Sequence, residues 1–248
     1  MMEPLAEFDA LVTYLYIVGG RAVNAPPPGA LAYPAPRRAN RARQTETLFI
    51  LTVPNGTVRA QAATYQTWSQ QVADAYFKTS GSITNGLRDA LAQLNKTILS
   101  EQKARMQPLR AGLIAAVMRE QELYLARCGP MQGVYLARST LATFPATRTA
   151  ELLTLAPPLG GGMEPRAELT RFDLAAGAML LLGDDSWLQA SDDALRGALQ
   201  SGADIAAVLD PLRSLVQANL IHGTLLQFVS EATPTPVLTT PAPAPPRS

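Results

Sequence analysis

Apolar residues follow two different periods along this chain, and the period changes several times. Short continuous runs of apolar and β-branched residues, bounded by turn formers, predict buried strands. These strands are expected at residues 12–18, 48–53, 111–118, 124–127, 135–138, 169–174, 178–182 and 224–230. Apolar residues at steps of three or four positions predict helices at residues 58–78, 83–100, 192–200 and 203–220. Strands and helices are grouped rather than alternating, which indicates an α+β fold with an antiparallel sheet or sandwich.

Two pairs of these strands have the sequence pattern of hairpins. The tetrapeptide Tyr124-Leu125-Ala126-Arg127 recurs at 135–138, and the residues between the two copies are rich in turn formers. Matched strands around a short turn predict a β-hairpin. The runs 169–174 and 178–182 predict a second hairpin around Ala175-Ala176-Gly177.

Prolines separate the expected folded part from two atypical segments. Residues 24–36 and 233–248 hold 11 of the 20 prolines. We therefore expect one domain at 1–232 with a Pro/Arg-rich insertion at 24–44, followed by a disordered Pro/Thr-rich tail at 233–248. A solvated, mobile linker is favoured over a phosphate or lipid contact for the arginines of the insertion, which are Arg37, Arg38, Arg41 and Arg43.

Composition excludes several classes of function. The 21 basic and 20 acidic residues give a net charge of +1, so nucleic acid and anionic membranes are poor partners. The single cysteine, Cys128, leaves no internal disulfide, and with the single histidine, His222, it excludes the usual zinc sites. No apolar run reaches the ~18 residues of a membrane span. The first 20 residues include three acidic residues and lack the basic region of a signal peptide, so the expected location is the cytoplasm.

Three stretches, taken in order, carry a resemblance to a known family. Leu48–Gly56 is a strand that ends in a turn before two helices, and 111–138 holds several strands around Gly129. The segment FDLAAGAMLLLGDD at 172–185 precedes Ser191-Asp192-Asp193, which opens a helix. From about residue 45 to 230 the chain resembles the type 2C (PPM) metal-dependent protein serine/threonine phosphatases. The resemblance implies a four-layer α/β/β/α sandwich, in which two antiparallel sheets are flanked by helix pairs.

The same resemblance implies a site in which aspartates bind two manganese or magnesium ions, and the ions activate a water that attacks phosphorus. This chain departs from that pattern. The family's bridging aspartate falls on Asn55, with Gly56 kept, and a second aspartate falls on Pro130. A third falls on Asp185, and the last falls on His222. One carboxylate of the expected set remains, and we expect these positions to converge on one shallow cleft at the edge of the sandwich.

The departures favour a site without a full metal centre. A neutral amide does not bridge two cations as a carboxylate does, and proline offers no side-chain ligand. We expect no cofactor beyond a weakly bound manganese or magnesium ion at Asp184 and Asp185. As alternatives, Asp184 and Asp185 form a solvated turn. His222 serves as a base or ligand, or else as a histidine at a helix end that is satisfied by hydrogen bonds or is a partner of the helix dipole. Cys128 is expected to be an inert thiol rather than one activated by Arg127.

Three functional hypotheses follow from the resemblance and its departures. The first is a catalytically inactive phosphatase-like domain that acts as a binding or regulatory module in serine/threonine phospho-signalling, with a kinase or a phosphoprotein as partner. The second is an active metal-dependent phosphatase with non-standard ligands. The third is a structural part of an assembly, for which the tail would be a spacer.

Overall fold

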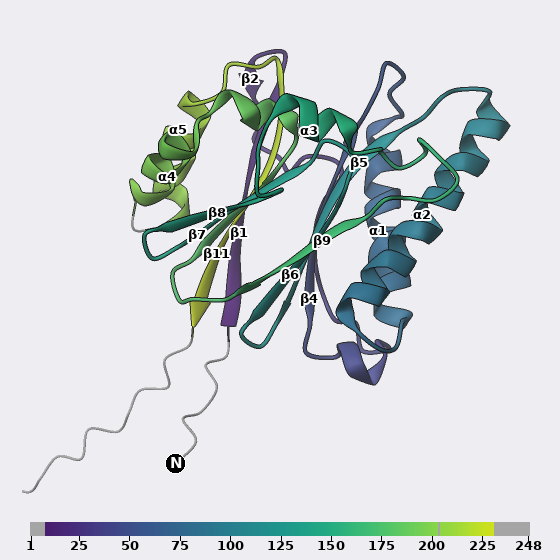
Figure 1. Ribbon diagram of the computed structural model, residues 1–248, viewed down its shortest axis with the longest axis horizontal. Coiled ribbons are helices and arrows are strands. Elements are labelled where there is room, and N and C mark those ends of the chain that lie inside the picture. The colour runs from purple at the N-terminus through teal and green to yellow at the C-terminus, as the bar shows by residue number, and fades with distance from the viewer. Residues whose placement is uncertain (1–7, 203, 231–248) are drawn as a thin grey trace, which may run out of the picture.

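The computed structural model describes residues 8–202 and 204–230, and within these it forms two antiparallel sheets packed face to face (Figure 1). The six-stranded sheet has the order β2 (Arg21–Ala22), β1 (Phe8–Val18), β11 (Leu220–Ser230), β10 (Met179–Gly183), β7 (Gln132–Ala137) and β8 (Thr140–Phe144). The five-stranded sheet has the order β3 (Ala30–Pro34), β4 (Thr47–Pro54), β5 (Ala111–Arg119), β6 (Glu122–Cys128) and β9 (Glu168–Asp173).

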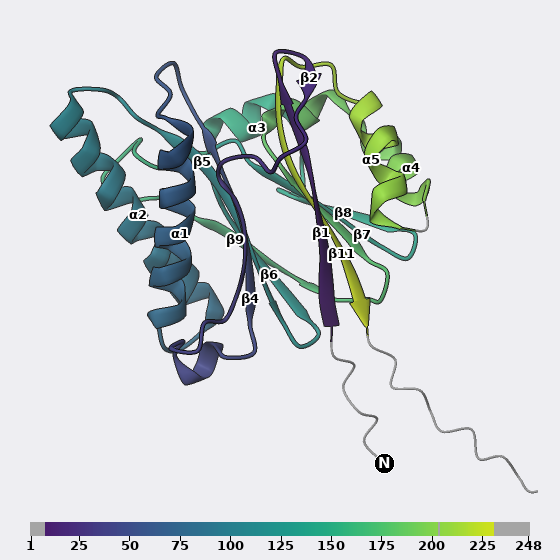
Figure 2. The same ribbon diagram turned by 180° about the vertical axis from the view of Figure 1, so that it is seen from behind.

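Helices cover the outer face of each sheet. The pair α1 (Ala62–Lys78) and α2 (Ile83–Arg105) lies on the five-stranded sheet, and the pair α4 (Asp192–Gln200) and α5 (Ile205–Ser214) lies on the six-stranded sheet (Figures 1 and 2). Shorter helical segments are η1 (Arg41–Arg43), α3 (Ala150–Leu155) and η2 (Asp185–Gln189). The expected α+β fold, a four-layer sandwich with helix pairs on opposite outer faces, is confirmed. Among the described residues, none of the helices combines the length and apolar composition needed to cross a membrane.

The hydrophobic core has three layers, which explains the uninterrupted apolar runs in the central strands. Strands buried on both faces lack the alternation of polar and apolar residues seen in half-exposed strands. In β4, Leu48 and Ile50 pack against α1 and α2, whereas Phe49 and Leu51 pack between the two sheets. A third apolar cluster joins the six-stranded sheet to α4 and α5.

Both predicted hairpins are wrong, because their strands lie in different sheets. Strand β6 pairs with β5 and β9, whereas β7 pairs with β10 and β8. Between β6 and β7 the chain crosses the sandwich at Gly129, whose φ of +76° favours glycine. Strands β9 and β10 likewise belong to different sheets. Two apolar strands around a turn have the same sequence pattern whether the turn closes a hairpin or carries the chain from one sheet to the other.

The helix predicted at 203–220 is too long. In the structure α5 ends at Ser214, and Leu220 begins β11, where it pairs with Val18. Val216 still contributes to the core beneath α4 and α5, so apolar residues continue at helical spacing after the helix has ended. By contrast, α4 begins as expected, with Ser191 Oγ accepting a hydrogen bond from Ala194 N.

The segment 24–44 is not the mobile linker that was predicted. It contains β3, the edge strand of the five-stranded sheet, and the helical turn η1. Arg43 is fully buried; its guanidinium lies 3.2 Å from Glu46 Oε1 and donates to Ser82 O at 2.8 Å. Tyr76 donates a hydrogen bond to the same Glu46 carboxylate at 2.6 Å. The predicted tail at 233–248 lies outside the described residues.

Candidate functional site

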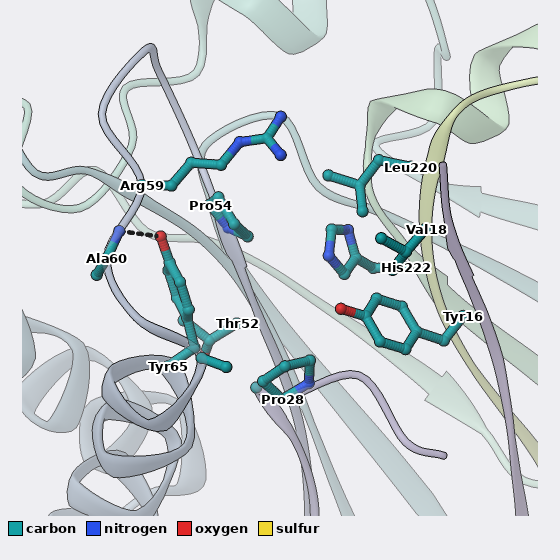
Figure 3. Close-up of a pocket in the computed structure, with 12 residues that line it drawn as sticks. Tyr16, Val18, Pro28, Thr52, Pro54, Arg59, Ala60, Tyr65, Leu220 and His222 are labelled. Carbon is teal, nitrogen blue, oxygen red and sulfur yellow. Dashed lines mark hydrogen bonds between the residues drawn. The ribbon is translucent and has the colours of Figure 1, made fainter. Parts of the chain in front are cut away.

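A pocket of about 170 Å³ opens between the two sheets, where β1 and β4 end (Figure 3). One wall comes from the six-stranded sheet and consists of Tyr16, Val18, Leu220 and His222. The other wall comes from the five-stranded sheet and the start of α1, and consists of Pro28, Gly29, Thr52, Pro54, Arg59, Ala60, Ala62 and Tyr65. The pocket therefore has two aromatic rings, one imidazole and one guanidinium among largely apolar surroundings.

Asp184 fixes the histidine of the pocket. Its Oδ2 accepts hydrogen bonds from His222 Nδ1 at 2.7 Å and from His222 N at 3.1 Å. Its Oδ1 accepts from Ser186 N at 3.1 Å and from Ser186 Oγ, so the carboxylate also caps η2. Asp184 and His222 are 7% and 5% exposed, and their contact is a buried pair of acid and imidazole.

The other edge of the imidazole faces the pocket. Tyr16 stacks on the ring of His222, with centroids 5.5 Å apart and an angle of 28° between the ring planes. No described residue forms a hydrogen bond with His222 Nε2, and His222 lines the pocket (Figure 3). Because Nδ1 is bonded to the Asp184 carboxylate, it carries a proton, and Nε2 is left to interact with whatever enters the pocket.

The opposite wall is held by hydrogen bonds of its own. Tyr65 accepts a hydrogen bond from Ala60 N at 3.0 Å (Figure 3). Burial raises the pKa of the Tyr65 hydroxyl, while the Ala60 N–H and the charge of Arg59 act to lower that pKa. Thr52 Oγ1 lies 2.8 Å from Ser69 Oγ, which joins β4 to α1. The wall is thus braced independently of the histidine.

A chain of buried side chains supports the acid–imidazole pair from behind. Gln132 donates from Nε2 to Asp184 O at 2.8 Å, and Arg148 donates from Nε to Gln132 Oε1 at 2.6 Å. Arg148 also donates to Trp187 O at 2.6 Å, and Trp187 Nε1 donates to His222 O at 3.1 Å. Gln132, Arg148 and Trp187 were not identified from the sequence, which carries no local motif for contacts between such distant positions.

Comparison with solved structures places this architecture among bacterial serine/threonine phosphatases. PppA of Pseudomonas aeruginosa, described as a key regulatory component of T6SS, matches with a TM-score of 0.65 at 17% identity, covering 91% of this chain and 99% of that chain. Stp1 of Staphylococcus aureus matches with a TM-score of 0.66 at 15% identity, covering 92% and 97%. This chain has the PPM phosphatase-like fold. The catalytic domain of PstP, solved with two manganese ions, matches with a TM-score of 0.60 at 16% identity, covering 90% and 98%.

A scan of protein-family models finds no match to the sequence, and a comparison with curated proteins finds none either.

Within this PPM phosphatase-like fold, the structure brings some of the predicted site positions together. His222 contacts Asp184 directly, and Asp185 is near enough to sense the charges of both. Partial burial of the Asp185 carboxyl raises its pKa, and the like charge of Asp184 raises that pKa further, although the residue as a whole is exposed. Among the described residues, neither Asn55 nor Pro130 has a hydrogen bond to any of these three. Their convergence on one cleft therefore stays a prediction.

The remaining predicted positions lie on the ends of the five-stranded sheet. Asn55 follows Pro54 of the pocket wall, and its N–H donates to Arg110 O at 3.2 Å. Gly56 has a φ of +93°, a conformation that favours glycine in this turn. Pro130 is buried in the crossing between β6 and β7. His222 lies in β11 rather than at a helix end, so the interpretation of this residue as a helix-dipole partner is wrong.

The single cysteine is also placed by the crossing between sheets. Cys128 ends β6 and is buried, with Sγ 3.8 Å from Arg166 O. Burial raises the pKa of the Cys128 thiol to about 12, although Arg127 acts to lower that pKa. The thiol is therefore protonated at neutral pH, as expected of an inert cysteine.

The donor set does not fit the two-ion centre that the PPM resemblance implies. Within 8–202 and 204–230, no three of the histidine, cysteine, aspartate and glutamate side chains are grouped closely enough to hold a metal ion. Asp184 has each carboxylate oxygen engaged by two N–H or O–H donors, and Pro130 has no donor atom in its side chain. Two divalent cations need several free carboxylate oxygens to offset their dehydration, so no catalytic step through such ions is derived from these residues.

Proposed function

We propose that this chain is a catalytically inactive PPM-type phosphatase-like domain that acts as a binding or regulatory module in serine/threonine phospho-signalling. Its partner would be a protein, either a kinase or a phosphorylated protein. The proposed module comprises residues 1–232, with 233–248 as a tail, and its cytoplasmic location stays a prediction. PppA, which shares the fold, is described as a regulatory component of a larger system, and this supports a regulatory role.

The hydrogen bonds of the Asp184 carboxylate are the observation that carries this proposal. A metal-binding carboxylate must present lone pairs to the ion, whereas Asp184 directs Oδ2 to His222 and Oδ1 to Ser186. Binding a cation would require breaking buried hydrogen bonds to a charged group, each worth about 1.5–3 kcal/mol. The position next to the inherited Asp185 is therefore organised around a histidine rather than around an ion.

An active metal-dependent phosphatase with non-standard ligands is the alternative, and one observation favours it. The like charge of Asp184 contributes to the raised pKa of the Asp185 carboxyl, and a cation beside Asp185 would relieve that repulsion. In this alternative one manganese or magnesium ion binds weakly at Asp184 and Asp185, and it has to displace hydrogen bonds of the Asp184 carboxylate. An ion of that kind supplies +2, half the charge of a two-ion centre.

Hydrolysis and thermal unfolding with and without 1 mM manganese test the proposal. We expect no manganese-dependent hydrolysis of p-nitrophenyl phosphate or of a phosphoserine peptide. A site with a millimolar Kd adds only ~0.4 kcal/mol at this concentration, whereas an intact centre of micromolar affinity adds ~4 kcal/mol. Manganese-dependent hydrolysis that is abolished by Asp185→Ala, and retained in the control Asp89→Ala on the exposed face of α2, would overturn the proposal in favour of the active enzyme.

A further inference from the structure

We propose that two copies of this chain form a two-fold symmetric dimer, in which the open edge of β1 pairs with the same edge of the second copy and Leu11 lies on the symmetry axis. The two strands run antiparallel, so the six-stranded sheets of both copies become one continuous sheet. This inference concerns assembly rather than the pocket, and it does not depend on the proposed function.

Strand β1 has a long edge without a neighbouring strand. It has 11 residues, whereas β2 has only two, and these pair with Ile17 and Val18. The pairing continues for one more residue, where Val23 N donates to Tyr16 O at 2.8 Å. From residue 8 to residue 15, no described residue pairs with this edge, and Figures 1 and 2 show β2 at one end of β1 only.

The backbone groups of alternate residues point out of this edge. Successive residues of an antiparallel strand direct their N–H and C=O groups to opposite sides. Because Tyr16 O points toward β2, the residues that direct their groups to the open edge are Phe8, Ala10, Val12 and Tyr14. In the described part of the chain, no further backbone group bonds to them there. A row of unpaired N–H and C=O groups is a template for another strand.

The other strands at the sheet edges have features that discourage such pairing. Strands β3 and β8 have only five residues each, and β3 ends in Pro34. Strand β9 has six residues, and it begins with Glu168 and ends with Asp173. In β1 the one charged residue is Asp9, whose Oδ1 accepts a hydrogen bond from Ala10 N at 2.7 Å. Pairing would exchange this exposed bond for one to a backbone carbonyl of the second copy.

Strand β2 limits how far the second copy can reach along β1. Val23 already occupies the carbonyl of Tyr16, so an incoming strand ends at the next outward residue, Tyr14. The first described residue of the second copy, Phe8, then lies opposite Tyr14. A register shifted further along would displace β2, and one shifted the other way would pair fewer residues.

This register makes the edge complementary to itself. Phe8 lies opposite Tyr14 of the second copy, and Ala10 lies opposite Val12, so that each of these pairs exchanges two backbone hydrogen bonds. The residue midway between them is Leu11, which therefore meets Leu11 of the second copy at the two-fold axis. A contact of one patch with itself is closed and ends at a dimer.

The side chains of β1 fit the same pairing. Leu11 is 47% exposed, and its contact with Leu11 of the second copy would remove apolar surface from water. On the same face Asp9 lies opposite Thr13, whose hydroxyl is a donor for the carboxylate, and on the other face the ring of Phe8 lies opposite that of Tyr14. No two like charges of β1 oppose each other, and a net charge of +1 for each chain causes little repulsion.

Sedimentation equilibrium of the full chain at increasing micromolar concentrations tests the dimer. We expect the mass to rise from that of one chain, 26.5 kDa, toward twice that value. Leu11→Lys places two like charges opposite each other at the axis, so it should weaken dimerisation at least about tenfold. The matched control is Leu155→Lys, which changes a leucine of α3 that is 71% exposed and should leave dimerisation unchanged. Thermal unfolding of both variants verifies that each is folded.

Cross-linking through Leu11→Cys tests the register. Residues opposite each other in a non-hydrogen-bonded antiparallel pair have Cα atoms about 4.5 Å apart, a separation that a disulfide spans, so oxidised glutathione should link the two copies. The natural Cys128 is buried and should not contribute. The control is Asp9→Cys, on the same face of the same strand, because its two copies would lie roughly 13 Å apart and should stay unlinked.

Three results would overturn this inference. A mass that stays at 26.5 kDa at every concentration would leave the edge of β1 to solvent or to a strand of another protein. A dimer that Leu155→Lys dissociates and Leu11→Lys does not would place the contact on α3. Equal cross-linking of Asp9→Cys and Leu11→Cys would contradict the axis at Leu11. None of these results bears on the manganese tests of the proposed function.

Discussion

Two buried charged clusters lie in different layers of this molecule, and they differ in what their polar atoms face. The Arg43 cluster, made of Arg43, Glu46 and Tyr76, lies beneath the helical layer, and the side chains of its ion pair are 0% exposed. The Asp184 pair, made of Asp184 and His222, is almost as deeply buried but borders a pocket. Burial of charge is therefore common to both clusters, and what distinguishes them is that only the Asp184 pair, of the two, borders a pocket.

The two clusters also differ in what they hold together. Arg43 Nη2 donates to Ser82 O at the N-cap of α2, and Asn40 N donates to Phe77 O near the end of α1, so the segment before β4 is fastened to both helices. The Asp184 pair joins the end of β10 to the start of β11, which are adjacent strands of one sheet. The first cluster thus fastens a connecting segment to two helices, whereas the second joins neighbouring strands.

Removing one member of the Arg43 cluster should have the largest effect on stability. Arg43→Ala leaves the Glu46 carboxylate buried without its main counter-charge, so we expect a loss of about 3–5 kcal/mol in the free energy of unfolding, measured in urea. Arg38→Ala, an exposed arginine of the same segment, is the control and should cost less than ~0.5 kcal/mol.

A double substitution distinguishes a lost charge pair from lost packing. Arg43→Met with Glu46→Leu removes both charges and keeps the apolar volume, so it should recover most of the stability lost by Arg43→Ala. If Arg43→Ala costs less than ~1 kcal/mol, the cluster does not fasten the segment to the helices.

The Asp184 pair should respond more weakly. Asp184→Asn keeps one acceptor oxygen but places an amide NH₂ against the N–H groups of His222, so we expect a loss of about 1–3 kcal/mol in urea unfolding. Asp193→Asn is the control, because its carboxylate is exposed and pairs with Arg196 within the same helix, α4. A loss for Asp184→Asn equal to that of Arg43→Ala would show that the pair is as much a structural element as the Arg43 cluster.

The elements of the fold were largely predictable from the sequence, and the two clusters were not. The segments 48–53 and 111–118 consist almost entirely of apolar and β-branched residues, and both are buried strands in the structure. Which sheet receives β7 depends on pairing with β10, more than forty residues further along, and no local pattern encodes that choice. In the same way, the contact between Asp184 and His222 joins positions 38 residues apart.

The burial of Arg43 could not be predicted from the local sequence either. A run of arginines among prolines has the composition of a solvated linker, and Arg37, Arg38 and Arg41 are indeed exposed. The burial of Arg43 depends on the position of Glu46 and on the hydroxyl of Tyr76, which is fixed only when α1 packs. Composition describes the average of a segment, whereas one buried ion pair depends on tertiary contacts.

A smaller effect is expected at Asp185, next to the Asp184 pair. The pKa of its carboxyl is raised in the folded chain, so the ionised form destabilises the fold at pH values above the folded pKa. This penalty is lost as pH falls through the folded pKa toward the unfolded value, below which the carboxyl is protonated in both states. Asp185→Asn should therefore raise the free energy of unfolding by no more than a few tenths of a kcal/mol at pH 7, once solvent screening is included.

Thermal unfolding of Asp185→Asn and of the unmodified chain, compared from pH 7 to pH 3, checks this sign. The gain from the substitution should shrink toward zero as the pH falls. A gain that grows on acidification would mean that the Asp185 carboxylate is stabilised in the folded chain, as a charge partner of His222 would be. The exposed Asp210→Asn on α5 is the control for a general loss of one negative charge.

The smallest effect is expected from the predicted tail. Residues 233–248 alternate proline with threonine and alanine, a composition that favours solvated, extended backbone over packing into a core. If the two buried clusters and the three apolar layers account for the stability of the domain, deleting 233–248 should change the free energy of unfolding by less than ~0.5 kcal/mol. Thermal unfolding of the truncated chain, measured beside the full chain, is the check. A clear loss of stability would show that the tail contacts the domain.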